Sequence, residues 1–348
     1  MKTKTWVVLP LMLFGCSLPY VMKQGVFQLE LLTGSKPIEK ALRSADLDLK
    51  KRKKLELIQD VRAFAKRRLG LKAHNYQDVN LSWDHSLHTV SACKEAKFEP
   101  YRWWFPIIGF VPYKGFFDKT DAFLEQKKLK DQGFDTQIGR VSGYSTLGFF
   151  SDPVWPSMLD LEDEALIDLI IHELTHETLY IAGQTTFNET LASYVARMGT
   201  ELYTKEKFGE KSPKHQGVLK YHRDHGVYQQ FFFDLTKKLE KLYGSDLTNE
   251  QKLLKKREIL TDAQKRYQQL DLKEPFSSID WSRVNNAYLM SFKSYNSDDR
   301  VLAELLSLMD KDFGRFFFEI DYFGRSKDPF KSMSERVLEL KGRADGKA

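Results

Sequence analysis

The chain has 348 residues, 42% hydrophobic and 13% aromatic, which is enough to bury a sizeable core and argues against a disordered protein. Its formal net charge of +6 at pH 7 is slight over this length, so nucleic acid is not expected as a partner. The two cysteines are Cys16 and Cys93, and we expect Cys93 to be a buried thiol rather than a nucleophile or half of a disulfide.

Residues 1–15 have the pattern of a secretory signal. A basic start precedes an uncharged apolar run over 6–14, which is far shorter than the roughly 20 residues that span a bilayer. The run ends at Leu13-Phe14-Gly15-Cys16, which resembles the lipobox of bacterial lipoproteins, in which the cysteine is acylated. We therefore predict a lipid anchor on Cys16 and a location at the membrane of the cell envelope, with an ordinary secretory signal as the alternative. Because Ser17 is not acidic, the resemblance implies an outer-membrane anchor facing the periplasm if the source is Gram-negative.

The chain after the signal begins with a helical pattern and then changes to short strands. Residues 26–69 carry apolar side chains at helical spacing, and the pattern stops at Gly70. Residues 76–118 alternate Pro and Gly with aromatic and β-branched runs, which is typical of strands and turns. A charged helix is predicted over 119–131, and strands are predicted within 136–150.

The second half of the chain is predicted to be helical. A strong helix is expected over 160–180, since acids cluster at its positive N-terminus and Gly183 follows its end. A second helix should run from about 187 to 203. Residues 214–271 are predicted to form long charged helices that turn back at Gly244-Ser245, and the rest of the chain is predicted to be helical as well.

These elements predict an α+β fold that is mainly helical, with a small mixed β-sheet followed by an all-helical C-terminal half. The expected organisation is a lipoprotein signal at 1–15, an N-terminal helical segment at 16–75, an α/β catalytic core at 76–205 and a helical region at 206–348 that completes the cleft. The basic run over 50–54 is predicted to be a solvated helix face, with attraction to anionic lipid as the alternative.

The sequence His172-Glu173-Leu174-Thr175-His176 lies within the helix predicted over 160–180 and has the spacing of a metal site. Two histidines four residues apart lie on one helical face, so their imidazoles can converge on one ion. Glu173 is rotated by about 100° from His172, which places its carboxylate beside the metal, where it can take a proton from water. We therefore predict His172 and His176 as zinc ligands and Glu173 as the catalytic base.

A catalytic zinc site needs a third protein ligand, and Glu189 is the best candidate. It lies thirteen residues after His176, and Gly183 lets the chain turn so that a second helix packs beside the first. The structural alternative is a capping box, in which Thr186 and Glu189 bond the first backbone groups of their own helix. We favour the ligand because the two histidines otherwise lack a third partner.

A second pair of histidines, His222 and His225, lies three residues apart and could also bind a metal. The pair falls in a polar helical stretch, so the prediction is a solvated helix face rather than a site.

The zinc motif followed by Asn188-Glu189 resembles the gluzincin metallopeptidases, whose third ligand is a glutamate on the next helix. Residues 187–194 are similar to the Asn-Glu-Gly-Phe-Ala-x-Tyr stretch of aminopeptidase N-like enzymes. More closely, and over most of its length, the chain resembles a bacterial family described as putative aminopeptidases. The resemblance implies a zincin-like catalytic core, a zinc cofactor and a peptide substrate.

Two further parts of the site follow from the resemblance. Tyr295 is the first candidate for a tyrosine that stabilises the oxyanion, with Tyr288 and Tyr180 as others. The strand predicted to pair with the peptide backbone consists of Tyr144, Ser145, Thr146, Leu147 and Gly148. This segment lacks the glutamate with which aminopeptidase N-like enzymes hold the α-amine of the substrate. We therefore predict that cleavage does not depend on a free amine.

The function predicted from the sequence is hydrolysis of short peptides in the cell envelope by water activated at a zinc ion. One alternative is a catalytically weak, peptide-binding or chaperone-like envelope lipoprotein, and another is a structural lipoprotein with an accidental histidine pair. The intact His172, Glu173 and His176 argue against the first alternative, and about one zinc per chain would exclude the second.

Overall fold

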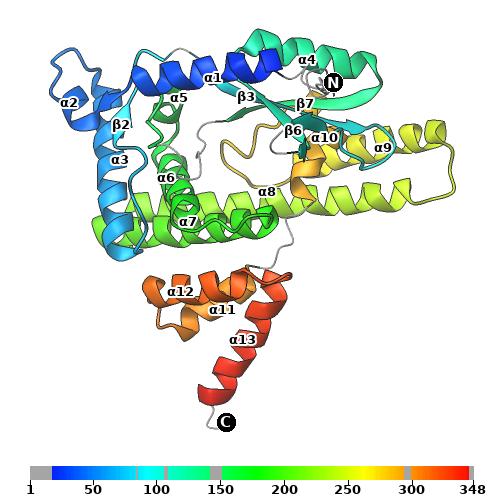
Figure 1. The fold of residues 1–348 in the computed structure, drawn as a ribbon. Coiled ribbons are helices and arrows are strands. Elements are labelled where there is room, and N and C mark those ends of the chain that lie inside the picture. Colours follow the sequence, from blue (N-terminus) through cyan, green and yellow to red (C-terminus); the bar gives the residue numbers. More distant parts are fainter. Residues whose placement is uncertain (1–17, 84, 106–108, 142–150, 294–298, 345–348) are drawn as a thin grey trace, which may run out of the picture.

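The computed structural model describes residues 18–83, 85–105, 109–141, 151–293 and 299–344. Within these ranges the protein is mainly helical, with a three-stranded antiparallel sheet and two smaller strand pairs (Figure 1). The predicted α+β class is confirmed at this level, but the sheet was predicted to be mixed and is antiparallel in the described residues. Over the same ranges, no helix is long and apolar enough to cross a membrane.

The N-terminal part of the described chain forms helices that pack around one side of the molecule. Its elements are α1 (Leu18–Thr33), β1 (Lys36–Pro37), α2 (Ile38–Leu42), α3 (Leu49–Arg68) and β2 (Asp78–Val79). The lysines at 50, 51 and 53 on α3 are exposed, as the predicted solvated face requires. The prediction is wrong for Lys54, which is buried and donates from Nζ to Asp163 Oδ1 at 2.6 Å. This ion pair joins α3 to α6 (Asp163–Thr178).

A small antiparallel sheet lies next to α1 and carries one helix. Its strand order is β6-β3-β7, and the bounds are β3 (Leu87–Lys94), β6 (Tyr113–Phe116) and β7 (Phe134–Val141). Helix α4 (Lys119–Asp131) has the bounds predicted from the sequence and packs against the sheet through Ala122 and Leu129. A separate hairpin pairs β4 (Trp103–Phe105) with β5 (Gly109–Val111).

Two helices at the centre of the molecule are packed closely against each other. After the short α5 (Pro156–Leu159), α6 runs into a loop and α7 (Thr185–Phe208) returns beside it. Gly199 of α7 allows this approach, since a Cβ there would lie 3.0 Å from Ile171 Cδ1 and 2.8 Å from Leu69 Cδ1. One apolar core passes through the pair and includes residues from Leu31 to Val337. The domain boundaries expected from the sequence stay predictions.

A long helical hairpin follows, formed by α8 (Pro213–Tyr243) and α9 (Asn249–Tyr267). Its turn falls at Gly244 and Ser245, as predicted, and a capping box of Thr248 and Gln251 begins α9. The short elements after it are η1 (Trp281–Arg283), α10 (Asn286–Leu289) and η2 (Met290–Phe292). Asn286 donates from Nδ2 to Lys94 O at 2.8 Å, which ties this region to the central strand of the sheet.

Three C-terminal helices pack beside α7 and the loop before it (Figure 1). They are α11 (Arg300–Leu308), α12 (Phe313–Gly324) and α13 (Pro329–Ala344). The ring of Phe316 lies 6.2 Å from that of Tyr194 on α7, centroid to centroid. At Gly324 the backbone approaches the loop so closely that a Cβ would lie 2.5 Å from Ile181 Cδ1. The C-terminal half is therefore helical, as predicted, and it supports the α6–α7 loop.

Candidate metal centre

Helix α6 carries polar side chains on one face and core side chains on the other. Asp168, His172 and His176 follow one another at intervals of four residues, which places them in one row along the helix. The side chains that anchor the opposite face are fully buried, and they are Leu166, Ile170, Ile171 and Leu174. Burial of this apolar face fixes the direction in which the histidines point.

The loop between α6 and α7 is held by Asn188 and turns at Gly183. Gly183 has φ of +80°, a left-handed conformation that glycine adopts without steric cost. The Asn188 amide makes two hydrogen bonds with Ile181, accepting from its N at 2.9 Å and donating to its O at 2.8 Å. Asn188 is almost fully buried, so these bonds set the start of α7 and the place of the next residue, Glu189.

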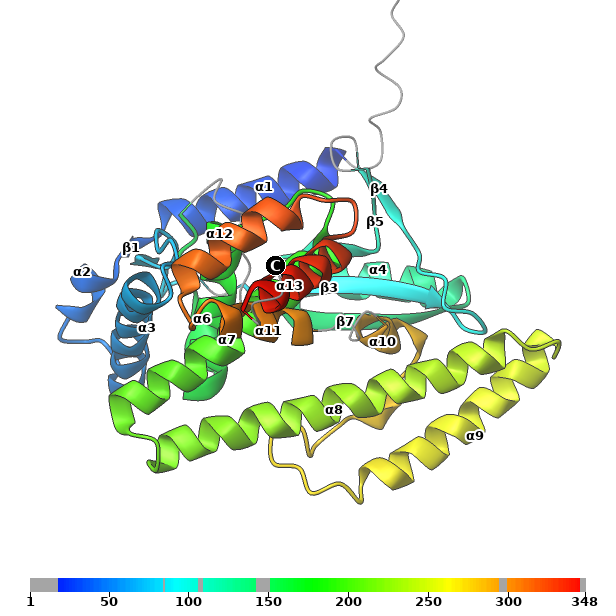
Figure 2. The same cartoon turned by 90° about the horizontal axis from the view of Figure 1, so that it is seen from below.

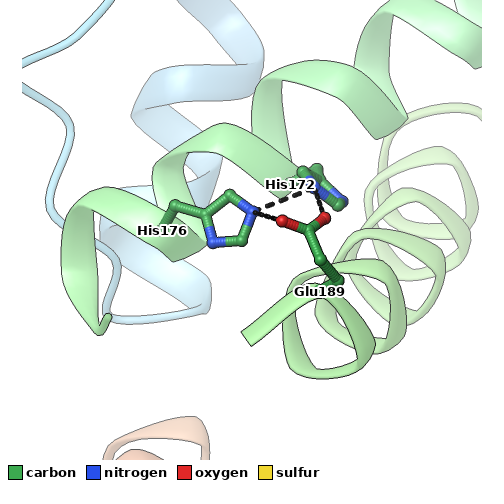
Figure 3. A group of neighbouring side chains, drawn as sticks. All are labelled: His172, His176 and Glu189. Carbon is green, nitrogen blue, oxygen red and sulfur yellow. Dashed lines mark hydrogen bonds and ion pairs between the residues drawn. The ribbon is translucent and has the colours of Figure 1, made fainter. Parts of the chain in front are cut away.

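The capping alternative for Glu189 is wrong. Helix α7 begins two residues earlier than a capping box would need, with Gln184 rather than Thr186 as its N-cap and no side-chain capping bond. Thr186 and Glu189 therefore both lie inside the helix, and the Glu189 carboxylate turns towards α6 instead (Figure 3).

Three donor atoms meet between the two helices (Figure 3). The Nε2 atoms of His172 and His176 lie 3.1 Å apart. The Glu189 carboxylate oxygens lie 3.4 Å from His172 Nε2 and 3.5 Å from His176 Nε2. In a tetrahedron with zinc bonds of about 2.0–2.1 Å, ligand atoms are about 3.3–3.4 Å from one another. The donor set and its spacing therefore fit a zinc ion, and the assigned roles stay predictions.

The pKa values of Glu189 and His172 each depend on the charge of the other. Burial alone would raise the pKa of Glu189, but hydrogen bonds from His172 and His176 bring it well below its usual range. Burial opposes protonation of His172, yet Glu189 and the neighbouring Glu173 raise its pKa overall. A divalent cation binds an ionised carboxylate and neutral imidazoles, so Glu189 has the charge that it needs, whereas at His172 it would compete with a proton.

Glu173 follows His172 directly and is buried, with 7% of its surface exposed. Removal from water raises the pKa of its carboxyl group, although His172 and His176 oppose this shift. It is absent from the group of converging donor atoms, which consists of the two histidines and Glu189. This position suits an acid–base role better than metal ligation.

The prediction of a solvated face at His222 and His225 is wrong for His222. Its side chain is 6% exposed and lies between two carboxylates, with Nε2 3.0 Å from Asp168 Oδ2 and Nδ1 2.9 Å from Glu201 Oε1. Burial lowers the pKa of His222, but the two carboxylates outweigh it and raise the pKa to about 9. His225 is exposed, as predicted, and pairs with Gln229. The two carboxylates bind opposite nitrogens of the His222 ring, so this group joins α6, α7 and α8 rather than enclosing a metal.

Several predicted site residues lie outside the described residues: Cys16, the strand from Tyr144 to Gly148, and Tyr295. The structure describes the two other tyrosine candidates. Tyr288 bonds the Tyr228 hydroxyl at 2.6 Å within the aromatic core between α8 and α10, so it is part of the packing there. Tyr180 is partly exposed, and its ring lies 6.1 Å from that of His176, which keeps it beside the site.

Two features near the metal centre were missed from the sequence. Tyr113, at the start of the edge strand β6, is exposed overall, and desolvation together with the charge of Glu189 raises the pKa of its hydroxyl, so the charge of the centre reaches it. Its spacing does not distinguish it from the other tyrosines among the 15 in the chain. Glu177 anchors a neighbouring segment instead, because its carboxylate accepts from the backbone N atoms of His74 and Asn75 at 3.0 Å each.

The chain was compared with models of known protein families, and one of them matches. The model of the family described as putative aminopeptidase matches residues 19–333, which covers most of the chain and the whole metal centre. The chain belongs to this family. Comparisons with curated proteins and with solved structures each gave no match.

Proposed function

We propose that this protein is a zinc-dependent peptidase of the gluzincin type, in which His172, His176 and Glu189 hold the metal. The observation that carries the proposal is the convergence of their donor groups: the two Nε2 atoms lie 3.1 Å apart, and the two Glu189 oxygens lie 3.4 Å from His172 Nε2 and 3.5 Å from His176 Nε2. These separations are close to the edge of a zinc tetrahedron, and three protein ligands leave one position open. The family description supports a peptide as the substrate.

The proposed chemistry is peptide hydrolysis. A zinc ion at this centre would lower the pKa of water towards about 7 and polarise the scissile carbonyl. Glu173 accepts a proton from the attacking water and returns it to the departing amine. Its burial supports this role, because a carboxyl group with a raised pKa is a stronger base and a better proton store.

A donor to the developing oxyanion is the other group that the reaction needs. Tyr180, beside His176, and Tyr113, on the edge strand β6 within the electrostatic influence of Glu189, are the described candidates. Tyr295 remains the candidate that the resemblance implies.

The location that we propose is the surface of a cell-envelope membrane, with a lipid on Cys16. The lipobox-like sequence supports this proposal. Mass spectrometry of the mature N-terminus tests it, and an unmodified Cys16 would contradict it.

Metal analysis of the purified chain tests the zinc site. We expect about one zinc per chain, and a marked loss of zinc in Glu189→Ala because the substitution removes a ligand oxygen. Glu210→Ala is the matched control, since Glu210 pairs with Lys205 at the surface and should leave zinc content unchanged. Equal zinc in the two variants would contradict the role of Glu189. Full zinc without peptide turnover would favour a peptide-binding lipoprotein instead.

A further inference from the structure

Helix α1 is held to the rest of the molecule by one stripe of side chains. Tyr20 donates from its hydroxyl to Gly115 O at 2.5 Å, and the Gln24 side chain accepts from Phe117 N at 3.0 Å. Further along, Phe27 contacts the ring of Phe117, and Leu31 is fully buried. These contacts fix which side of α1 faces the protein and which side faces outward.

The outward side of α1 is also apolar. Four side chains on it are 46–64% exposed, and they are Val21, Met22, Val26 and Leu29. At about 100° per residue they cover an arc of about 140°, within which no charged residue falls. Surface helices normally carry polar groups on this side, as α3 does with exposed lysines at 50, 51 and 53. The outer face of α1 therefore lacks the side chains that suit contact with water.

A second apolar feature lies beside the first turn of α1. Trp104 and Phe110 are direct cross-strand partners in the β4–β5 hairpin and are 48% and 65% exposed. The hairpin's buried residue Phe105 meets the Tyr20 ring at 5.7 Å, so the hairpin and α1 are neighbours. Figure 2 shows α1 and this hairpin at the same edge of the molecule. We call the four α1 side chains and this pair the α1–hairpin face.

We propose that the α1–hairpin face rests on a lipid bilayer. The inference rests on the proposed lipid at Cys16, which lies two residues before the start of α1. An acyl chain at that position holds the first turn of α1 at the membrane surface, with its apolar side free to enter the interface. Tryptophan next to exposed apolar groups is the composition that membrane interfaces favour.

The length of α1 decides its orientation. Its 16 residues extend about 24 Å at 1.5 Å per residue, less than the roughly 30 Å of a hydrocarbon core. Because α1 is also fixed along one side by the sheet, it lies along the bilayer surface rather than through it. The lipid and the face would together give two points of attachment, which hold a protein on a membrane more firmly than one acyl chain.

The test places an environment-sensitive dye on the lipid-modified full chain in vesicles of phosphatidylethanolamine and phosphatidylglycerol. Val26→Cys and Phe110→Cys each introduce a labelling site, and Cys93 is buried and remains unlabelled. Leu254→Cys on α9 is the matched control, since Leu254 is exposed to a similar degree, at 55%. Lipids that bear a nitroxide near the headgroup quench a dye only if it enters the bilayer.

The proposal predicts that dyes at 26 and 110 lose most of their fluorescence to the nitroxide lipid, while the dye at 254 does not. Equal quenching at the three positions would overturn it. A blue shift at 26 without quenching would mean that protein covers the face, and that result would also overturn it. The mass of the N-terminal peptide reports lipid attachment separately, and hydrolysis of a soluble peptide reports the peptidase separately. If lipid attachment or peptide hydrolysis fails, its own measurement shows the failure independently of the quenching result.

Discussion

At the scale of single residues, the metal centre depends on two neighbours with different tasks. Glu189 supplies a donor atom, and Asn188 holds the loop that brings Glu189 to the histidines. The spacing of His172 and His176 could be interpreted from the sequence because four residues make nearly one helical turn. The position of Glu189 could not be derived in the same way. It depends on how α7 packs against α6, and Thr186 offered an equally regular capping pattern.

Asn188→Ala should lower both stability and metal affinity. The substitution leaves the N–H of the buried Ile181 without its partner, and Ile181 O keeps only the bond from Gln184 N, so we expect a loss of about 1–3 kcal/mol of the free energy of unfolding. Zinc affinity should fall as well, because the loop no longer fixes Glu189. Denaturant unfolding and zinc titration measure the two effects.

Gln184→Ala is the control for this prediction, since the side chain of Gln184 in the same loop makes one longer bond, from Nε2 to Ser326 O at 3.3 Å, and the substitution keeps its backbone bonds. It should change both quantities less than Asn188→Ala. Wild-type stability and zinc affinity in Asn188→Ala would show that the loop holds its shape by packing alone.

At the scale of elements, the helices with clear start and stop residues were predicted well. Helix α4 has the expected bounds because Asp118 caps it and Gly133 follows its end. The turn at Gly244-Ser245 was equally recognisable. The region over 26–69 was predicted as helical throughout, but Pro37 and the segment at 43–48 divide it into α1, α2 and α3. The exposure of two charged residues was also predicted wrongly, because Lys54 and His222 are buried in ion pairs with residues of other helices.

The buried group around His222 predicts a pH dependence of stability. Its pKa in the folded state, about 9, lies above the ordinary value of 6.5. Its contribution is therefore fully present below pH 6.5 and is lost as the pH rises through 9. At about 1.4 kcal/mol per pKa unit, the loss amounts to at most about 3 kcal/mol. Unfolding free energies measured from pH 6 to 10 should fall over this window.

His222→Gln should remove most of this slope, because glutamine does not titrate. The variant should also be less stable at pH 6.5, where Asp168 and Glu201 lose their shared cation. His225→Gln, at an exposed neighbour, should keep the wild-type slope. The same slope in His222→Gln and the wild type would assign the pH dependence to other groups.

At the scale of the whole molecule, distant parts of the chain complete the surroundings of the centre. The C-terminal helices support the α6–α7 loop at Gly324, and the charge of Glu189 reaches Tyr113 on the edge strand β6. Gly324 and Ile181 are 143 positions apart in the chain and Tyr113 and Glu189 are 76 apart, so no local pattern encodes these arrangements. The helical composition of the C-terminal half was therefore predictable, whereas its place beside the metal centre was not.

The molecule as a whole also bears on which peptides the proposed peptidase would cleave. The acids on α6 next to the histidine pair are engaged elsewhere, Glu177 with the backbone of His74 and Asn75, and Asp168 with His222 and Thr200. Holding a buried α-ammonium group without a carboxylate would cost several kcal/mol. We therefore expect the enzyme to cleave N-acetylated peptides as well as free ones.

A peptide series with free and acetylated termini, compared at equal zinc loading, checks this expectation. Comparable kcat/KM values for the two forms are the expected result. Strict dependence on the free amine would mean that a carboxylate from elsewhere in the chain reaches the substrate.

The central claim is that Glu173 acts as the base of a zinc peptidase, and turnover of one peptide by Glu173→Gln tests it most directly. Glutamine keeps the shape of the side chain but cannot accept the proton. Zinc content should therefore match the wild type, while kcat falls by about 10²–10⁴-fold. Undiminished turnover in the zinc-loaded variant, or loss of its zinc, would contradict the account.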